Sequence, residues 1–240
     1  MRGPRVVAVA ASGLVVLGVV VALVALASQP AQDPAPAPTA AAPAEAPLPA
    51  DAGLRPSADP GWVERVAAET DIPQRALAAY ARADIVARAE YGCAVGWNTL
   101  AGIGWVESHH GALQGGAVEQ DGVARPSIVG IPLDGTDDTM EIVDTDGGAL
   151  DGDAEWDRAV GPMQFIPETW SIWGVDGDGD GAVDPHDIDD AALTAARYLC
   201  HAQGTLEGSD AWIGAVRTYN DTDDYQLRVA EAATRYAAAG

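Results

Sequence analysis

The chain has 240 residues, a length that allows one domain of ordinary size with extensions. Its 36 acidic residues against 13 basic ones give a formal net charge of -23, so a polyanion such as DNA or RNA is repelled and no nucleic-acid partner is expected. Acidity of this kind suits a solvated surface or a cation-binding site.

The first 27 residues predict export. Arg2 and Arg5 precede an apolar run over residues 6–27, which is long enough to span a bilayer with the rest of the chain outside the cytoplasm. The tripeptide at residues 25–27, Ala-Leu-Ala, also resembles a cleavage site. Residues 1–27 are therefore either a transmembrane anchor or a signal peptide, and the protein is expected to be extracytoplasmic, membrane-anchored and facing the cell wall, or secreted.

Residues 28–58 are dominated by proline and alanine and are expected to form an extended, disordered linker. The folded domain is expected to cover residues 59–240. Its two cysteines, Cys93 and Cys200, would lie in an oxidising compartment, where a disulfide is expected between them. The alternative is two buried free thiols.

From Asp59 onward the pattern is helical, and Asp59-Pro60 is a start signal because aspartate caps and proline suits the first turn. Ser209 and Asp223 stand where two later caps are expected. The expected helices cover about residues 61–70, 74–91, 97–109, 167–173, 189–201, 210–219 and 224–238.

Residues 111–160 are rich in glycine and aspartate and lack helical periodicity. They are expected to form a long irregular loop insertion, with short strands near residues 127–131 and 140–143. The domain is therefore expected to be mainly α.

Residues 176–187, DGDGDGAVDPHD, have the spacing of a twelve-residue calcium loop, with Gly181 at the sharp turn. The expected ligands are Asp176, Asp178, Asp180, Asp184, Asp187 and the carbonyl group of Ala182. The last position is aspartate instead of the usual glutamate, and the alternative is a solvated acidic turn. We expect a structural calcium ion in an EF-hand-like loop and no organic cofactor. A second acidic run, residues 144–153, lacks this spacing and is interpreted as a solvated loop.

The stretch GWVESHHG, residues 104–111, places Glu107 near the C-terminal end of a helix that is apolar nearly all round. Burial and the negative end of the helix both disfavour a charged carboxylate, so the pKa of Glu107 should be raised and the group can act as a general acid. A buried glutamate paired with an arginine explains the helix equally well. His109 and His110 are adjacent and point about 100° apart, which does not fit the zinc motif H-E-x-x-H.

Three motifs favour the interpretation of Glu107 as a general acid. The pair E-S at 107–108, the tetrapeptide G-P-M-Q at 161–164 and the pair Y-N at 219–220 together resemble the lytic transglycosylases, enzymes with a lysozyme-like helical fold that cut peptidoglycan. The longer strings AVGPMQFIPETW, GVDGDGDGAVDP and AARYLC resemble the membrane-bound lytic transglycosylase B type of actinobacteria, which carries a calcium loop of this kind. The resemblance covers about residues 60–230, and its departure is Thr218 where the family often has alanine.

The resemblance implies that Glu107 is the sole catalytic carboxylate. It would protonate the glycosidic oxygen between N-acetylmuramic acid and N-acetylglucosamine, and the N-acetyl group of the substrate would relieve the positive charge. Glu107 would then take the proton of the C6 hydroxyl as that oxygen attacks C1, which leaves a 1,6-anhydromuramoyl end. An ordinary glycosidase needs two carboxylates, and the sequence leaves Asp153 and Asp157 open as a partner.

The resemblance also places residues of the three motifs near the sugar. Gln164 offers donors and an acceptor to a sugar amide or hydroxyl, and Ser108 is an orienting partner. Asn220 either contacts substrate or fixes the local backbone. Trp156 and Trp173 flank the Gln164 segment and are candidates for sugar stacking. The full set of expected substrate-binding residues is Ser108, Met163, Gln164, Tyr219, Asn220, Trp156 and Trp173.

The leading hypothesis is therefore a cell-wall lytic transglycosylase whose partners are peptidoglycan glycan strands and, through residues 1–27, the membrane. The alternatives are a non-catalytic calcium-stabilised peptidoglycan-binding module and a hydrolytic muramidase. The sequence does not identify protein partners.

Overall fold

The computed structural model describes residues 39–49, 57–136 and 139–240. The expected anchor or signal peptide, residues 1–27, lies outside the described residues, as do residues 28–38 and 50–56 of the expected linker. In the described ranges, every helix is too short or too polar to cross a bilayer.

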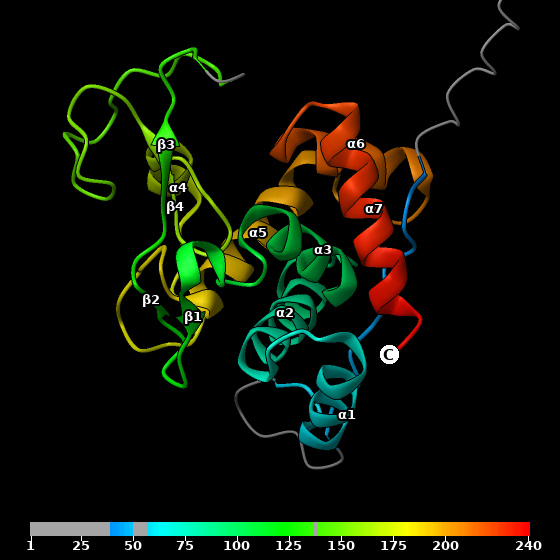
Figure 1. The fold of residues 1–240 in the computed structure, drawn as a ribbon. Coiled ribbons are helices and arrows are strands. Elements are labelled where there is room, and N and C mark those ends of the chain that lie inside the picture. Colours follow the sequence, from blue (N-terminus) through cyan, green and yellow to red (C-terminus); the bar gives the residue numbers. More distant parts are fainter. Residues whose placement is uncertain (1–38, 50–56, 137–138) are drawn as a thin grey trace, which may run out of the picture. The chain divides into compact units, whose positions relative to one another are not determined.

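The described chain is mainly helical, as the sequence predicted (Figure 1). The α-helices are α1 (Pro60–Thr70), α2 (Gln74–Val86), α3 (Trp97–Ser108), α4 (Pro167–Trp173), α5 (Ile188–Gln203), α6 (Ser209–Tyr219) and α7 (Asp223–Ala237). The expected helix over residues 74–91 is α-helical to Val86 and continues as a π-helical turn, Ala87–Tyr91. A short 3-10 turn, Leu113–Gly115, follows α3.

Three residues were predicted to cap helices, Asp59, Ser209 and Asp223, and the structure confirms Asp59. Asp59 caps α1, where its carboxylate accepts a hydrogen bond of 2.8 Å from the backbone N–H of Trp62. The cap of α7 is Thr222 instead of Asp223, because its hydroxyl accepts from the N–H of Tyr225. The predicted cap at Ser209 is also wrong, since α6 starts at Ser209 after Gly208.

The expected insertion contains two small antiparallel sheets. Strands β1 (Ala117–Val118) and β2 (Ala124–Arg125) form the first, and β3 (Val129–Pro132) and β4 (Arg158–Val160) form the second. Strand β3 overlaps the strand expected near residues 127–131. The segment 140–143 forms isolated bridges instead of a strand, from Glu141 to Asp134 and from Val143 to Trp156.

Helix α3 is the centre of the core and packs against α2, α5 and α7. Its side chains Trp97, Leu100 and Ile103 are fully buried. The glycines of α3 allow close approach, because a Cβ atom on Gly102 would lie 2.9 Å from the carbonyl oxygen of Val229 in α7. A helix surrounded in this way must be apolar on nearly every face, and α3 is.

Cys93 and Cys200 form the expected disulfide, with their Cα atoms 5.9 Å apart. Cys93 lies in the loop before α3, and Cys200 lies in α5. The bridge therefore joins two elements that flank the central helix.

Residues 39–49, which we call the strap segment, lie against the helices, although the sequence predicted an extended, disordered linker. Asn98 at the start of α3 accepts a hydrogen bond of 2.7 Å from the backbone N–H of Ala44. The Gln226 side chain of α7 donates to the carbonyl oxygen of Thr39 at 2.7 Å. Alanines of the strap segment are buried among the core residues. Small side chains that fit against helices, together with buried amides that satisfy the backbone, explain why a proline- and alanine-rich segment docks here.

Candidate functional site

Glu107 lies in the last turn of α3, where the helix ends at His109 in a left-handed conformation. Its Oε1 atom accepts a hydrogen bond of 2.5 Å from the hydroxyl of Tyr225 in the first turn of α7. Glu107 is partly exposed and Tyr225 is buried. The carboxyl group is thus held by one neutral donor.

The surroundings of Glu107 favour its protonated form. Burial raises the pKa of the Glu107 carboxyl to about 7, while the hydrogen bond from Tyr225 and the positive charge of Arg228 act in the opposite direction. Burial, followed by the nearby charge of Glu107, raises the pKa of Tyr225 well above its ordinary value, so that its hydroxyl remains a donor. A carboxyl group with a pKa near neutral can both give and take a proton at physiological pH.

Ser108 connects the end of α3 to the G-P-M-Q segment. Its hydroxyl donates to the carbonyl oxygen of Pro162 at 2.6 Å and accepts from the N–H of Gly111 at 2.8 Å. Met163 is fully buried, and its sulfur lies 3.3 Å from the position that a Cβ atom on Gly104 would take. The structure therefore brings the first two motifs together, with Ser108 and Met163 in supporting positions.

Gln164 is partly buried, and its backbone has a positive φ of 49°. Its side-chain nitrogen donates to the carbonyl oxygen of Gly161 at 2.9 Å. The side chain thus closes the turn of its own segment in this structure.

Tyr219 at the end of α6 links the third motif to the other two. Its hydroxyl donates to the carbonyl oxygen of Met163 at 2.8 Å. Its ring is nearly parallel to that of Tyr225, with 6.4 Å between the centroids. Asn220 follows as the exposed residue that ends α6, and its N–H bonds the carbonyl oxygen of Val216. Tyr219 therefore packs against Tyr225, which bonds Glu107, and Asn220 lies at the C-terminal end of α6.

The two candidate tryptophans take different positions. Trp156 is half-buried in the insertion and is bridged to Val143. Trp173 ends α4, and the guanidinium carbon of Arg197 lies 5.4 Å from its ring centroid. The ring of His201 lies 4.6 Å from the same centroid. Tyr198 lies 5.7 Å from it as well, so Trp173 is already packed against three side chains of α5.

Sequence reasoning missed Tyr225, the side chain that contacts the Glu107 carboxylate directly. Its position in the first turn of an amphipathic helix predicts an ordinary core aromatic. The available signal was a tyrosine three residues after the capping Thr222 and six after Tyr219, so that two tyrosines flank the turn between α6 and α7.

Asp153 and Asp157, the two carboxylates that the sequence left open as partners, are engaged elsewhere. Asp157 is buried and accepts from the N–H and hydroxyl groups of Thr145, at 2.9 and 2.7 Å. Asp153 pairs with Arg158 at 2.8 Å. Among the residues that the structure describes, the groups that shift the pKa of Glu107 are Tyr225 and Arg228, and no carboxylate is one of them.

The expected calcium loop lies between α4 and α5, and several of its backbone N–H groups donate hydrogen bonds to carboxylates of the same loop. Carboxylate oxygens of Asp176, Asp178 and Asp190 lie within 4.8 Å of one another, and so do those of Asp178, Asp187 and Asp189. Asp190, in the first turn of α5, was not expected to take part. Asp180 and Asp184 accept hydrogen bonds from the backbone of the loop, at Ala182 and His186.

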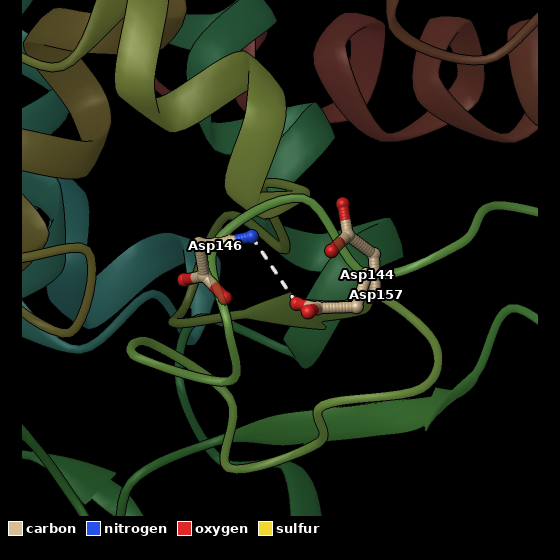
Figure 2. A group of neighbouring side chains, drawn as sticks. All are labelled: Asp144, Asp146 and Asp157. Atoms are coloured by element: carbon tan, nitrogen blue, oxygen red, sulfur yellow. Dashed lines mark hydrogen bonds between the residues drawn. The ribbon is translucent and has the colours of Figure 1, made fainter.

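Figure 2 shows the second group of carboxylates, Asp144, Asp146 and Asp157, whose oxygens also lie within 4.8 Å of one another. The N–H of Asp146 donates to Asp144 at 3.1 Å (Figure 2). Asp144 further accepts from Gly147 and Gly148, and Asp146 accepts from the two residues after Gly148. Hydrogen bonds within the loop account for this arrangement.

One family model matches part of the chain, and several solved structures are similar to it. Residues 137–237 match the family model described as the Transglycosylase SLT domain, and Glu107 precedes the matched region. Similar solved structures include the Escherichia coli lytic transglycosylase Slt35 in complex with bulgecin A, with 16% sequence identity, a TM-score of 0.44 and coverage of 80% of each chain. The soluble lytic transglycosylase SltB1 from Pseudomonas aeruginosa has 16% identity and a TM-score of 0.47, over 74% of this chain and 79% of that one. SltB3 from the same bacterium, in complex with NAG-anhNAM-pentapeptide, has 18% identity and a TM-score of 0.39, over 73% of this chain and 70% of that one. No curated protein sequence matches the chain. The C-terminal part of the chain, residues 137–237, is thus similar in sequence to a transglycosylase SLT domain.

Proposed function

We propose that this protein is a peptidoglycan lytic transglycosylase in which Glu107 is the single acid and base. The observation that carries the proposal is the Glu107–Tyr225 pair, a carboxyl group with a pKa of about 7 held by a tyrosine hydroxyl. The match of residues 137–237 to the transglycosylase SLT domain supports it. The strings that resemble the membrane-bound B type support assignment to that subgroup.

The reaction balances with one carboxyl group. Protonated Glu107 gives its proton to the glycosidic oxygen, and the bond between that oxygen and C1 of the muramoyl residue breaks. The carboxylate that remains is stabilised by the Tyr225 hydroxyl, since a donor favours the charged form. Glu107 then takes the proton of the C6 hydroxyl as O6 bonds to C1, which regenerates the acid and consumes no water.

The contacts of Asp153 and Asp157 favour the transglycosylase over a hydrolytic muramidase. A glycosidase with two carboxylates needs the second near the sugar, at a defined distance from the first. Asp157 is buried on Thr145, and Asp153 pairs with Arg158. In the part of the chain that the structure describes, neither acts on the pKa of Glu107.

A paired substitution tests the role of Glu107. Purified peptidoglycan is digested with residues 39–240 as wild type, as Glu107→Gln and as Glu141→Gln, and the muropeptides are analysed by mass spectrometry. Glu141 is an exposed carboxylate in the insertion and serves as the matched control. We expect anhydromuramoyl ends from the wild type and the control, and none from Glu107→Gln. Reducing ends would indicate a muramidase, and binding without cleavage by all three would indicate a glycan-binding module.

The proposal extends to a calcium ion in the acidic loop. The acidic loop suits calcium because clustered carboxylate oxygens are the ligands that calcium prefers. Without a cation these oxygens repel one another. Asp176, Asp178 and Asp190 form one group of clustered oxygens and Asp178, Asp187 and Asp189 form another, and either group would hold the ion. It would stabilise the loop that joins α4 to α5, and no step of the reaction passes through it.

We also propose that the enzyme works outside the cytoplasm. The apolar run over residues 6–27 and the disulfide between Cys93 and Cys200 support this location. Residues 1–27 would anchor the protein in the membrane or be removed on secretion.

A further inference from the structure

We propose that His110 is a positioning residue for Glu107, an inference that rests on the proposed function. His110 and two tyrosines, Tyr80 of α2 and Tyr236 of α7, form a group that we call the His110 clamp. The clamp holds the backbone turn that ends α3, so that the Glu107 carboxylate keeps its place against Tyr225.

The clamp is buried and fully paired. Nδ1 of His110 lies 3.2 Å from the Tyr80 hydroxyl, and Nε2 lies 3.0 Å from the Tyr236 hydroxyl. A neutral imidazole has one donor and one acceptor, and a phenol can serve as either, so both contacts are satisfied together. His110 is 2% exposed, and burial lowers its pKa to about 3, which keeps the ring neutral. The side chain thus acts as a rigid bridge between two helices.

The backbone around His110 explains why a bridge is needed. His109 and His110 both have left-handed φ angles, 51° and 59°. Such angles are uncommon for residues other than glycine and persist where the surroundings hold them. The N–H of His110 folds back onto the carbonyl oxygen of Gly104 at 2.9 Å, and the Tyr80 hydroxyl packs over Gly104 as well. The clamp therefore holds the turn from outside, within three residues of Glu107.

Helix α7, which packs along α3, makes two hydrogen bonds to the end of α3 that carries Glu107 and His110. Tyr225 near its start bonds Glu107, and Tyr236 near its end bonds His110. Packing of the two helices sets their overall placement, and these two hydrogen bonds fix the polar side chains at this end of α3. A charged group beside the clamp is Arg235, whose guanidinium carbon lies 4.8 Å from the Tyr236 ring centroid. His109 is exposed and lies against Trp105, with 4.4 Å between centroids, so it offers a matched control.

The test compares Tyr236→Phe with His109→Asn. The first variant removes one hydrogen bond from His110 and keeps every residue of the left-handed turn. The second keeps a residue type that tolerates the left-handed region. With residues 39–240 we expect Tyr236→Phe to lower kcat for anhydromuramoyl product by roughly three- to tenfold with KM nearly unchanged, and His109→Asn to leave both unchanged. Tyr80→Phe should behave as Tyr236→Phe does.

A second measurement is independent of turnover. The pKa of Glu107 is followed by NMR of its side-chain carboxyl carbon, assigned by its absence in Glu107→Gln. Tyr225→Phe gives the direction in which this pKa moves when the tyrosine contact is lost. We expect Tyr236→Phe to move it in that same direction by a smaller amount, and His109→Asn to leave it in place.

The outcomes separate the two proposals. If the wild type produces no anhydromuramoyl ends, the proposed function fails, and the pKa comparison still decides whether the clamp positions Glu107. If Tyr236→Phe lowers only the melting temperature and leaves kcat and the Glu107 pKa unaltered, the clamp is structural and the inference is overturned. Equal effects of Tyr236→Phe and His109→Asn would overturn it as well.

Discussion

The hydroxyl of Tyr225 lowers the pKa of Glu107 against the larger effect of burial, and Tyr225→Phe removes this hydroxyl with little change of shape. The variant loses the 2.5 Å hydrogen bond between Tyr225 Oη and Glu107 Oε1. A hydrogen bond to a charged group contributes about 1.5–3 kcal/mol, and a change of one in pKa corresponds to about 1.4 kcal/mol. With the bond in place the pKa of Glu107 is about 7. We therefore expect its pKa to rise by about one to two pH units in the variant.

The sign of this change follows from which form the hydrogen bond favours. A donor favours the carboxylate, so its loss favours the acid and extends the protonated form to higher pH. The free enzyme needs the proton on Glu107, so the alkaline limb of the kcat/KM profile reports this pKa. We expect the limb near pH 7 in the wild type and at about pH 8–9 in Tyr225→Phe, with kcat lowered because the carboxylate formed in the reaction is less stabilised.

The control for this experiment is Tyr219→Phe. The Tyr219 hydroxyl bonds the carbonyl oxygen of Met163, and its ring stacks on Tyr225, so its loss should leave the alkaline limb in place. An alkaline limb of Tyr225→Phe that stays at the wild-type position, or that moves to lower pH, would refute the reasoning.

Three further predictions concern stability. Residues 59–240 should melt at least about 6 °C below residues 39–240 in calorimetry, because each lost hydrogen bond of the strap segment costs about 1 kcal/mol; equal melting temperatures would mean that the strap segment contributes nothing. Chelation of calcium should lower the melting temperature of the wild type and have little effect on Asp178→Asn, since a bound ion stabilises the folded state by mass action; no response of the wild type would contradict a calcium site. Replacing both Cys93 and Cys200 by alanine should lower the free energy of unfolding in urea by about 4–5 kcal/mol, since the bridge spans 107 residues of sequence; a change below about 1 kcal/mol would contradict the loop-entropy account.

Much of the helical framework was predictable because its signals are local. The structure confirms the mainly α fold and the disulfide between Cys93 and Cys200. Helix α4 has the bounds that Pro167 and Gly174 predict at its two ends. The error at the start of α7 has a local cause too, because Thr222 and Asp223 are adjacent residues that can both cap a helix.

The parts that could not be predicted depend on contacts between distant segments. Tyr225 lies 118 residues from Glu107 in sequence, and nothing in its own helix distinguishes it from a core tyrosine. The strap segment has the composition of a spacer, and its order comes from side chains that belong to α3 and α7. His110 reads as a polar residue at a helix end, and its burial depends on Tyr80 and Tyr236. Tertiary packing thus determines the positions of Tyr225, the strap segment and His110, and local sequence signals do not reveal these positions.

The most direct test of the single-carboxylate mechanism is a digestion of peptidoglycan by residues 39–240 in water labelled with heavy oxygen, followed by mass spectrometry of the muramoyl ends. The account predicts anhydromuramoyl ends with no label, because O6 of the substrate closes the ring and Glu107 returns to its acid form without water. Labelled reducing ends, formed by the wild type and absent with Glu107→Gln, would contradict it and would require a second group to activate water.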